Sequence, residues 1–224
     1  MPVILCIETA TKLCSVALGR DGVLLAEQEL ASDRLVHAEK INVFIGAVLR
    51  EAGVDMRGLH AVAVGIGPGS YTGLRIGLSA AKGLCYALGI PIIGVSTLET
   101  LVQSVGLKGQ AQWPMIDARR MEVFTQGFDP DGRAHGEAAP LLLDEAWAAS
   151  VDSCIVFGDG ADKATELWSR HPRITHRPGV RPHARAMLAI AEARLASGTT
   201  DDLAYLVPLY GKEAKVTQPR KKGA

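Results

Sequence analysis

The sequence predicts an α/β fold with two lobes: a first lobe built on a mixed five-stranded sheet flanked by helices, and a smaller, divergent second lobe. Three observations lead to this prediction. Short apolar runs alternate with segments of helical periodicity through the first hundred residues. Eight of the 24 glycines fall within residues 65–94, between an expected strand and an expected helix. The second half of the chain repeats the strand and turn chemistry of the first.

The first hundred residues follow the order β-β-β-α-β-α-β-α. Apolar runs predict strands at residues 3–7, 13–18, 23–30, 59–64 and 92–95. Apolar spacing of three and four residues predicts helices at residues 35–52 and 74–88, and the Ser96–Glu99 capping box opens a third. Asp21-Gly22 is a turn signal that joins two strands into a hairpin. A hairpin followed by strand–helix units gives one sheet with both antiparallel and parallel pairing.

The second half resembles the first in pattern more than in identity. Pro114–Arg119 has the same order of apolar strand, carboxylate and loop as Leu5–Ala10, and Ile155–Gly160 parallels Ala63–Gly67. We therefore expect a duplicated unit. The expected boundaries are residues 1–105 for the first lobe, 106–211 for the second lobe and 212–224 for a basic flexible tail.

Charge and composition exclude several classes of protein. The 24 basic and 24 acidic residues cancel, so the chain has no overall positive field to attract nucleic acid, and only the basic tail favours direct contact with it. No apolar run approaches the roughly 20 residues of a membrane span, and the first residues lack a signal-peptide pattern. The four cysteines form no C-x-x-C pair. We expect a cytoplasmic protein that does not associate with membranes.

The glycine-rich turn at residues 65–77 has two interpretations. Glycines between a strand and a helix leave backbone N–H groups bare at a helix N-terminus, where a phosphate could bind. On this interpretation the candidate phosphate or nucleotide contacts are Gly67, Gly69 and Ser70, together with Glu8, Thr9 and Thr11 at the end of the first strand. Neither phosphate fingerprint fits, because Ser70 replaces the third glycine of G-x-G-x-x-G and no Gly-Lys-Ser/Thr follows. Alternatively, Gly73 and Gly77 allow close packing on one helix face, and Glu8 accepts bonds from loop N–H groups.

No assembled catalytic set is found in the sequence. The six histidines form no H-x-x-x-H or H-E-x-x-H pattern, so no metal ligand is assigned. No serine lies in a G-x-S-x-G elbow, and neither Cys6 nor Cys14 has an obvious histidine partner. We therefore assign no catalytic residue.

The segments Ile7–Thr11 and Cys14–Leu18 resemble the opening of the TsaB (YeaZ) family, and Gly67–Gly77 closely resembles that family's central signature. Shorter matches follow at Pro91–Thr97, Ile116–Arg119 and Glu122–Val123. The resemblance is dense over residues 3–128 and returns at Pro208–Tyr210. It implies the two-lobed actin/sugar-kinase/Hsp70-like fold, which is also called ribonuclease H-like.

The resemblance also implies a function. Members of the family are bacterial subunits of the machinery that installs N6-threonylcarbamoyladenosine beside the anticodon of tRNAs reading codons that begin with A. They act as non-catalytic scaffolds or activators of a catalytic paralogue, TsaD, and a small ATPase, TsaE, joins the complex. The expected partners are thus a TsaD-like paralogue, a TsaE-like ATPase, a second copy of the chain when alone, and tRNA through the complex. ATP and Mg²⁺ are expected at the level of the complex, and no cofactor is assigned to this chain.

Three departures from the family pattern bear on these expectations. Glu8 stands where the family usually has aspartate, which weakens the case for nucleotide binding at the first motif. Ile41 and Val43 replace a leucine and a proline after the first helical histidine. The C-terminal Tyr-Leu-Arg is Tyr210-Gly211-Lys212 here, so no arginine is available for a role at that position.

The helices at residues 34–52 and 72–88 are the expected docking face. In the family they pair with the matching helices of TsaD or with a second copy. Apolar residues lie on more than one side of each helix, and Gly73 and Gly77 would let a partner helix approach closely. The expected interface residues are His37, Ile41, Phe44, Ile45, Val48, Tyr71, Thr72, Arg75, Ile76, Ala80 and Leu84.

Two alternatives belong to other classes of protein. A nucleotide-binding ATPase or kinase of the same fold would use the glycine-rich turn for phosphate. A protease acting on its partner would need a nucleophile with a base, which the sequence does not offer.

Overall fold

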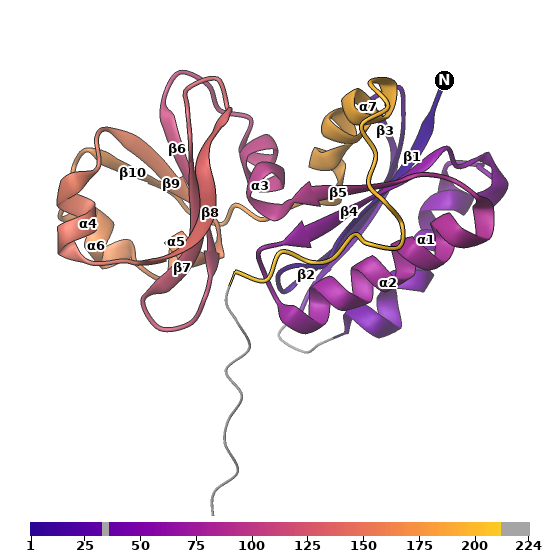
Figure 1. Cartoon of the computed structure of the whole chain (residues 1–224). Coiled ribbons are helices and arrows are strands. Elements are labelled where there is room, and N and C mark those ends of the chain that lie inside the picture. The colour runs from indigo at the N-terminus through magenta and orange to yellow at the C-terminus, as the bar shows by residue number, and fades with distance from the viewer. Residues whose placement is uncertain (33–35, 212–224) are drawn as a thin grey trace, which may run out of the picture.

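The computed structural model describes residues 1–32 and 36–211, which form two lobes, each built on a five-stranded sheet (Figure 1). The strands are β1 (Val3–Glu8), β2 (Leu13–Arg20), β3 (Val23–Ala31), β4 (Ala61–Gly67), β5 (Ile92–Ser96), β6 (Ala111–Asp117), β7 (Glu122–Phe128), β8 (Ala134–Leu142), β9 (Cys154–Phe157) and β10 (Ile174–Arg177). The α-helices are α1 (His37–Glu51), α2 (Tyr71–Leu88), α3 (Thr97–Val105), α4 (Glu145–Ser150), α5 (Asp159–Asp162), α6 (Thr165–Ser169) and α7 (Leu188–Ala196). Two short 3-10 helices are η1 (Met56–Gly58) and η2 (Ala184–Met187).

The first sheet has the strand order β3-β2-β1-β4-β5. β1 lies at its centre, antiparallel to β2 and parallel to β4, so that Ile4 pairs with Gly19 on one side and with Ala61 on the other. The mixed five-stranded sheet expected from the sequence is confirmed. Its strand–helix order also agrees with the expected one, since η1 is the single added element before α3.

The second sheet repeats the topology of the first. Its order is β10-β9-β6-β7-β8, with β6 at the centre, antiparallel to β7 and parallel to β9. Gly67 ends β4 and Gly158 follows the equivalent strand β9, and their φ angles are +104° and +101°. These angles favour glycine because they lie in the left-handed region. The faint sequence likeness between the two halves therefore reflects a repeated arrangement of strands and turns.

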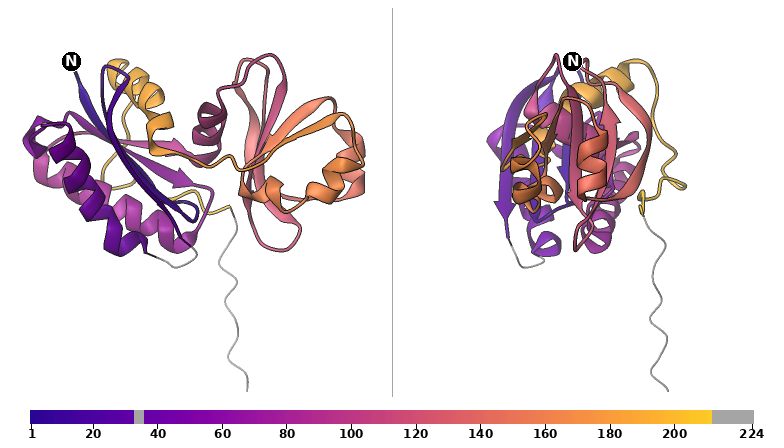
Figure 2. Two further views of the ribbon diagram at one scale, coloured as in Figure 1. Left: turned by 180° about the vertical axis from the view of Figure 1, so that it is seen from behind. Right: turned by 90° about the vertical axis from the view of Figure 1, so that its left-hand side faces the viewer.

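Helices cover both faces of the first sheet (Figures 1 and 2). Leu5 and Ile7 of β1 pack toward α1 and α2, whereas Ile4 and Cys6 pack toward η2 and α7. All six residues of β1 are buried, which explains why the sequence shows a continuous apolar run rather than an alternation. The glutamate that ends β1 is thereby carried into the interior.

Two helices pack on the sheet of the other half of the sequence. Leu98 and Leu101 of α3 pack against the second sheet, and Leu188 and Ala191 of α7 pack against the first. The boundary near residue 105 separates the strands of the two sheets, but α3 and α7 each pack on the sheet from the other side of that boundary. The division into a first lobe at 1–105 and a second lobe at 106–211 stays a prediction.

The last described segment, residues 201–211, runs back along the first lobe (Figure 1). We call it the strap. The expected basic tail at residues 212–224 lies outside the described residues, as does Leu35 of the expected first helix. Within the described ranges, no helix is long and apolar enough to cross a membrane.

Candidate partner groove and inter-lobe cleft

Helices α1 and α2 lie side by side on the first sheet and enclose a groove of about 600 Å³ (Figure 1). Each helix buries an apolar stripe in the core beneath, including Ile45 of α1 and Leu78 of α2. The groove above is lined by Ala38, Ile41, Asn42, Tyr71, Thr72, Arg75, Ile76, Ser79 and Ala80. A hollow between two helices with both apolar and polar lining can receive side chains of a partner helix.

The residues expected at a partner interface occupy three depths. Tyr71, Thr72 and Arg75 are exposed in the first turns of α2. Those half-buried between the helices and the solvent are Phe44, Ile76, Ala80 and Leu84. Those buried within the chain itself are His37, Ile41, Ile45 and Val48. Of these, Ile41, Ile45 and Val48 belong to the stripe that packs on the sheet, so in this chain they support the groove from below, with Ile41 at the groove floor, whereas His37 lies against Thr11.

Gly73 and Gly77 face the interior of the chain. A Cβ at Gly73 would overlap the Thr9 carbonyl oxygen, and a Cβ at Gly77 would overlap the Thr9 hydroxyl. The same hydroxyl donates a hydrogen bond to Gly73 O at 2.8 Å. The prediction that this glycine spacing serves a partner helix is therefore wrong, because the turn after β1 already fills the space. The alternative of close packing is confirmed, but within the chain.

Glu8 is fully buried beside this contact. Its Oε1 accepts a hydrogen bond from Ala10 N at 2.7 Å, and Thr97 Oγ1 donates to its Oε2 at 3.4 Å. A Cβ at Gly65 would overlap the carboxyl group. Burial raises the pKa of Glu8 to about 7, although the hydrogen bonds from backbone N–H groups oppose this shift. With no exposed surface, Glu8 cannot reach a nucleotide in this conformation.

The other five candidate phosphate contacts also hold the turn together. Thr9 is fully buried, and Thr11 Oγ1 accepts from Leu13 N at 3.2 Å. Ser70 caps α2 by accepting from Gly73 N at 3.2 Å, and its own N–H donates to Ala10 O at 2.7 Å. Gly67 is buried, whereas Thr11, Gly69 and Ser70 border the cleft between the lobes. The phosphate role of these residues stays a prediction.

The inter-lobe cleft has a volume of about 520 Å³. Its first-lobe wall includes Thr11 and His37, and its second-lobe wall includes Asp117, Arg119 and Asp159. His37 Nε2 lies 2.9 Å from Thr11 O, and its Nδ1 has no hydrogen-bond partner among the described residues. Two carboxylates and a guanidinium line the same second-lobe wall, so the cleft has no single sign of charge.

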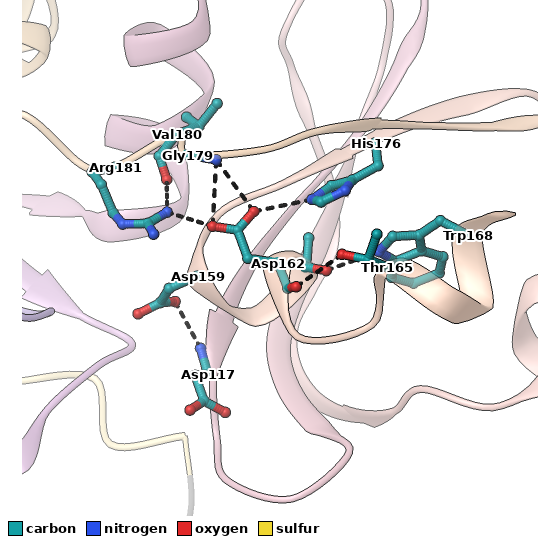
Figure 3. Close-up of polar contacts among 10 residues, drawn as sticks. Asp117, Asp159, Asp162, Thr165, Trp168, His176, Gly179, Val180 and Arg181 are labelled. Carbon is teal, nitrogen blue, oxygen red and sulfur yellow. Dashed lines mark hydrogen bonds and ion pairs between the residues drawn. The ribbon is translucent and has the colours of Figure 1, made fainter.

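Polar contacts tie the second-lobe wall to its own lobe (Figure 3). Asp159 Oδ1 accepts from Asp117 N at 2.9 Å, and burial raises the pKa of Asp159 although this bond lowers it in part. The Asp162 carboxylate accepts from Arg181 at 2.7 Å and lies 3.0 Å from His176 Nε2. These contacts join α5 to β6, to β10 and, through Arg181, to the segment after β10, which leads back to the first lobe.

Three side chains lie close enough to hold a metal ion: Glu27, Glu29 and His183. In the structure these side chains instead contact protein groups. Glu29 Oε1 lies 2.7 Å from His183 Nδ1, and Ser15 Oγ donates to the same oxygen at 2.7 Å. Arg185 donates to Glu27 Oε2 at 2.5 Å. The cluster fastens η2 to β3.

Comparison with known proteins decides the family. A sequence profile described as TsaD, tRNA N6-adenosine threonylcarbamoyltransferase, matches residues 29–150. The tRNA threonylcarbamoyladenosine biosynthesis protein TsaB of Escherichia coli (strain K12) is 34% identical over 218 residues, covering 92% of this chain and 93% of that protein. The chain belongs to the TsaB family.

Solved structures agree with the family. YeaZ from Pseudomonas aeruginosa superposes with a TM-score of 0.77 at 30% identity, covering 94% of this chain and 100% of that one. Ethanolamine utilization protein EutJ from Carboxydothermus hydrogenoformans, at a TM-score of 0.54 and 12% identity, covers 85% of this chain and 90% of its own, and shows the fold alone. The expected TsaB family and two-lobed actin-like fold are confirmed. Nothing in the structure or these comparisons favours the ATPase or kinase alternative.

Some residues of the TsaB-like groove and cleft were missed from the sequence. Ser79 lies four residues after Arg75 on the same helical face, so helical spacing could have found it. Asn42 likewise follows Ala38 by four residues on α1. Asp159 reaches the cleft from α5, and its counterpart position after Gly67 is a proline, so comparing the two halves gave no signal.

Proposed function

We propose that this chain is a non-catalytic subunit in tRNA threonylcarbamoyladenosine biosynthesis and that it docks a TsaD-type paralogue through the groove between α1 and α2. The observation that carries the proposal is the groove itself, which remains open and is bordered by exposed Tyr71, Thr72 and Arg75. Membership of the TsaB family supports the pathway. The fold of the first lobe needs only the lower faces of the two helices, which leaves their upper faces for a partner.

A structural role, rather than catalysis, is supported by the state of the cysteines. All four are buried free thiols. Burial raises the pKa of Cys14, Cys85 and Cys154 to about 11 each, and that of Cys6 still further. Thiols held protonated in this way make poor nucleophiles.

In the same proposal a TsaE-like ATPase and tRNA join through the assembled complex, and a homodimer of the isolated chain uses the same groove. The TsaD-type partner should therefore compete for this groove and dissociate the homodimer. ATP and Mg²⁺ act at the level of the complex in the reducing cytoplasm. Calorimetric titration of the isolated chain with ATP and Mg²⁺ should give no heat of binding, and tight binding would favour the kinase-like alternative.

The decisive test uses purified TsaD-type protein from the same organism. We expect the wild-type chain to bind it in a calorimetric titration and to be required for modification of tRNA in a reconstituted system. The variant compared with wild type is Ser79→Arg. Ser79 is exposed in the groove, and a long charged side chain there would block a partner without disturbing the core. Equal affinity of wild type and Ser79→Arg would contradict the groove proposal.

A further inference from the structure

The strap, residues 201–211, is fixed at both ends. Asp201 N donates to Ile92 O at 3.0 Å, and the Asp201 carboxylate accepts from Gly94 N at 2.7 Å. At the other end Leu209 N donates to Ile66 O at 2.8 Å. Between these points Lys82 of α2 donates to Ala204 O at 3.1 Å. A segment held in this way presents its outer side chains in set positions, which lowers the entropic cost of binding.

The outer side of the strap is apolar. Tyr205, Val207, Leu209 and Tyr210 are exposed by 82%, 63%, 49% and 42%. Leu203 and Leu206, by contrast, pack against the first-lobe core and supply the strap's own anchoring. Contiguous exposed apolar side chains on a soluble protein mark interaction sites. Tyr205 and Val207 are thus open to a partner, whereas Leu209 and Tyr210 border a pocket that they share with Phe124 of the second sheet.

A tyrosine–arginine cluster joins the strap to helix α2. The ring centroids of Tyr71 and Tyr210 lie 4.9 Å apart, and Arg75 Nε donates to Tyr210 Oη at 3.2 Å. Arg75 Cζ also lies 4.5 Å from the centroid of the Tyr71 ring. Tyrosine and arginine are the residue types that often dominate the binding energy of protein interfaces. Because Tyr71 and Arg75 line the groove as well, the strap continues the surface of the groove.

The charge of this surface indicates what it faces. Helix α2 contains no acidic residue. Arg75 forms no ion pair with a carboxylate among residues 1–32 and 36–211, where its neighbours are the two tyrosines. A guanidinium that lies over the Tyr71 ring and is held by the Tyr210 hydroxyl at an exposed position is well placed to receive a carboxylate from a partner.

We infer that the strap surface, made up of Tyr71, Arg75, Tyr205, Val207, Leu209 and Tyr210, is a second arm of the docking site. The occupant is the TsaD-type partner, which presents a carboxylate to Arg75 flanked by apolar side chains. This inference rests on the proposed function, since the same partner fills the groove. It adds a contact outside the paired helices and makes the C-terminal segment part of the interface.

The test compares affinities for purified TsaD-type protein by calorimetric titration. We expect Tyr210→Ala and Arg75→Glu each to weaken binding by about 10- to 30-fold, the usual effect of losing a central interface residue. Tyr210→Phe keeps the ring in place and should stay within about threefold of wild type. Leu142→Ala is the control, because Leu142 is similarly exposed (54%) but lies on β8 of the second sheet.

The outcomes separate this inference from the proposed function. If Tyr210→Ala and Arg75→Glu both bind with wild-type affinity while Ser79→Arg binds more weakly, the inference about the strap is wrong and the groove proposal stands. Wild-type affinity in all three variants contradicts both the strap inference and the groove proposal. Because Arg75 also lines the groove, weakened binding by Arg75→Glu supports the strap only when Tyr210→Ala weakens binding as well, and weakened binding by Arg75→Glu alone overturns the strap inference. Thermal unfolding of each variant checks that its fold is retained.

Discussion

The Thr9 hydroxyl donates a hydrogen bond to the carbonyl of Gly73 at 2.8 Å, which joins the turn after β1 to the start of helix α2. Glycine at 73 and 77 permits this approach, since a Cβ at either position would overlap Thr9. The contact sets the position of α2, and hence the width of the groove between α1 and α2. In the docking proposal, the glycine-rich turn therefore acts indirectly, by placing helix α2.

Replacing Gly73 by alanine should destabilise the chain by at least about 2 kcal/mol, because the added Cβ meets backbone that cannot move aside cheaply. Gly83→Ala is the matched control: Gly83 lies on the same helix, and a Cβ added there meets nothing within 4 Å. We expect it to stabilise by up to about 1 kcal/mol through helix propensity. Urea unfolding measures both, and an equal effect of the two substitutions would contradict this role of the glycines.

Glu8 should make stability depend on pH. Its folded pKa, about 7, lies above its ordinary value of 4.5, so between these pH values the folded chain holds a proton that the unfolded chain has released. Stability from this group is full below about pH 4.5, falls as pH rises toward 7, and is constant well above the folded pKa. Glu8→Gln keeps an acceptor for Ala10 N but cannot titrate.

The difference in unfolding free energy between wild type and Glu8→Gln should accordingly change by about 3 kcal/mol from pH 5 to pH 8, to the disadvantage of wild type. Urea unfolding at several pH values measures it. A difference that stays constant over this range would show that the Glu8 carboxyl is not held protonated by burial.

Asp162 should be important for the stability of the second lobe. Its carboxylate binds Arg181 and His176, and replacing it by alanine removes the contact with His176 and leaves Arg181 bonded to the Val180 carbonyl (Figure 3). We expect Asp162→Ala to cost about 2–3 kcal/mol. Asp131→Ala is the control, since the exposed pair of Asp131 with Arg133 at 3.8 Å should contribute little. Similar small losses in both variants would argue against a structural role for the Asp162 contacts.

Much of the first lobe could be predicted because its signals are local. The strands and helices over residues 3–96 were visible as apolar runs and helical spacing, and Ser96 caps α3 by accepting from Leu98 N, as its sequence pattern indicates. The resemblance of Gly67–Gly77 to the family signature then indicated the two-lobed actin-like fold. Local periodicity, however, does not say which surface a helix packs against.

That limit explains what the sequence did not reveal. Gly73 and Gly77 have the spacing of a helix–helix contact, yet their neighbour is Thr9, 64 residues away from Gly73 in sequence. Similarly, α3 and α7 pack on the sheet of the opposite half of the chain, which a division of the sequence at one point cannot express. The Tyr71–Tyr210 contact depends on a strap that returns to the first lobe after the whole second lobe has been formed.

The central claim is that a TsaD-type partner docks on the α1–α2 groove. Hydrogen–deuterium exchange of this chain with and without the purified partner tests it most directly. We predict slower exchange in peptides from α1, α2 and the strap, with unchanged exchange in β8 of the second sheet. Protection confined to the second lobe, with α1 and α2 unchanged, would contradict the claim.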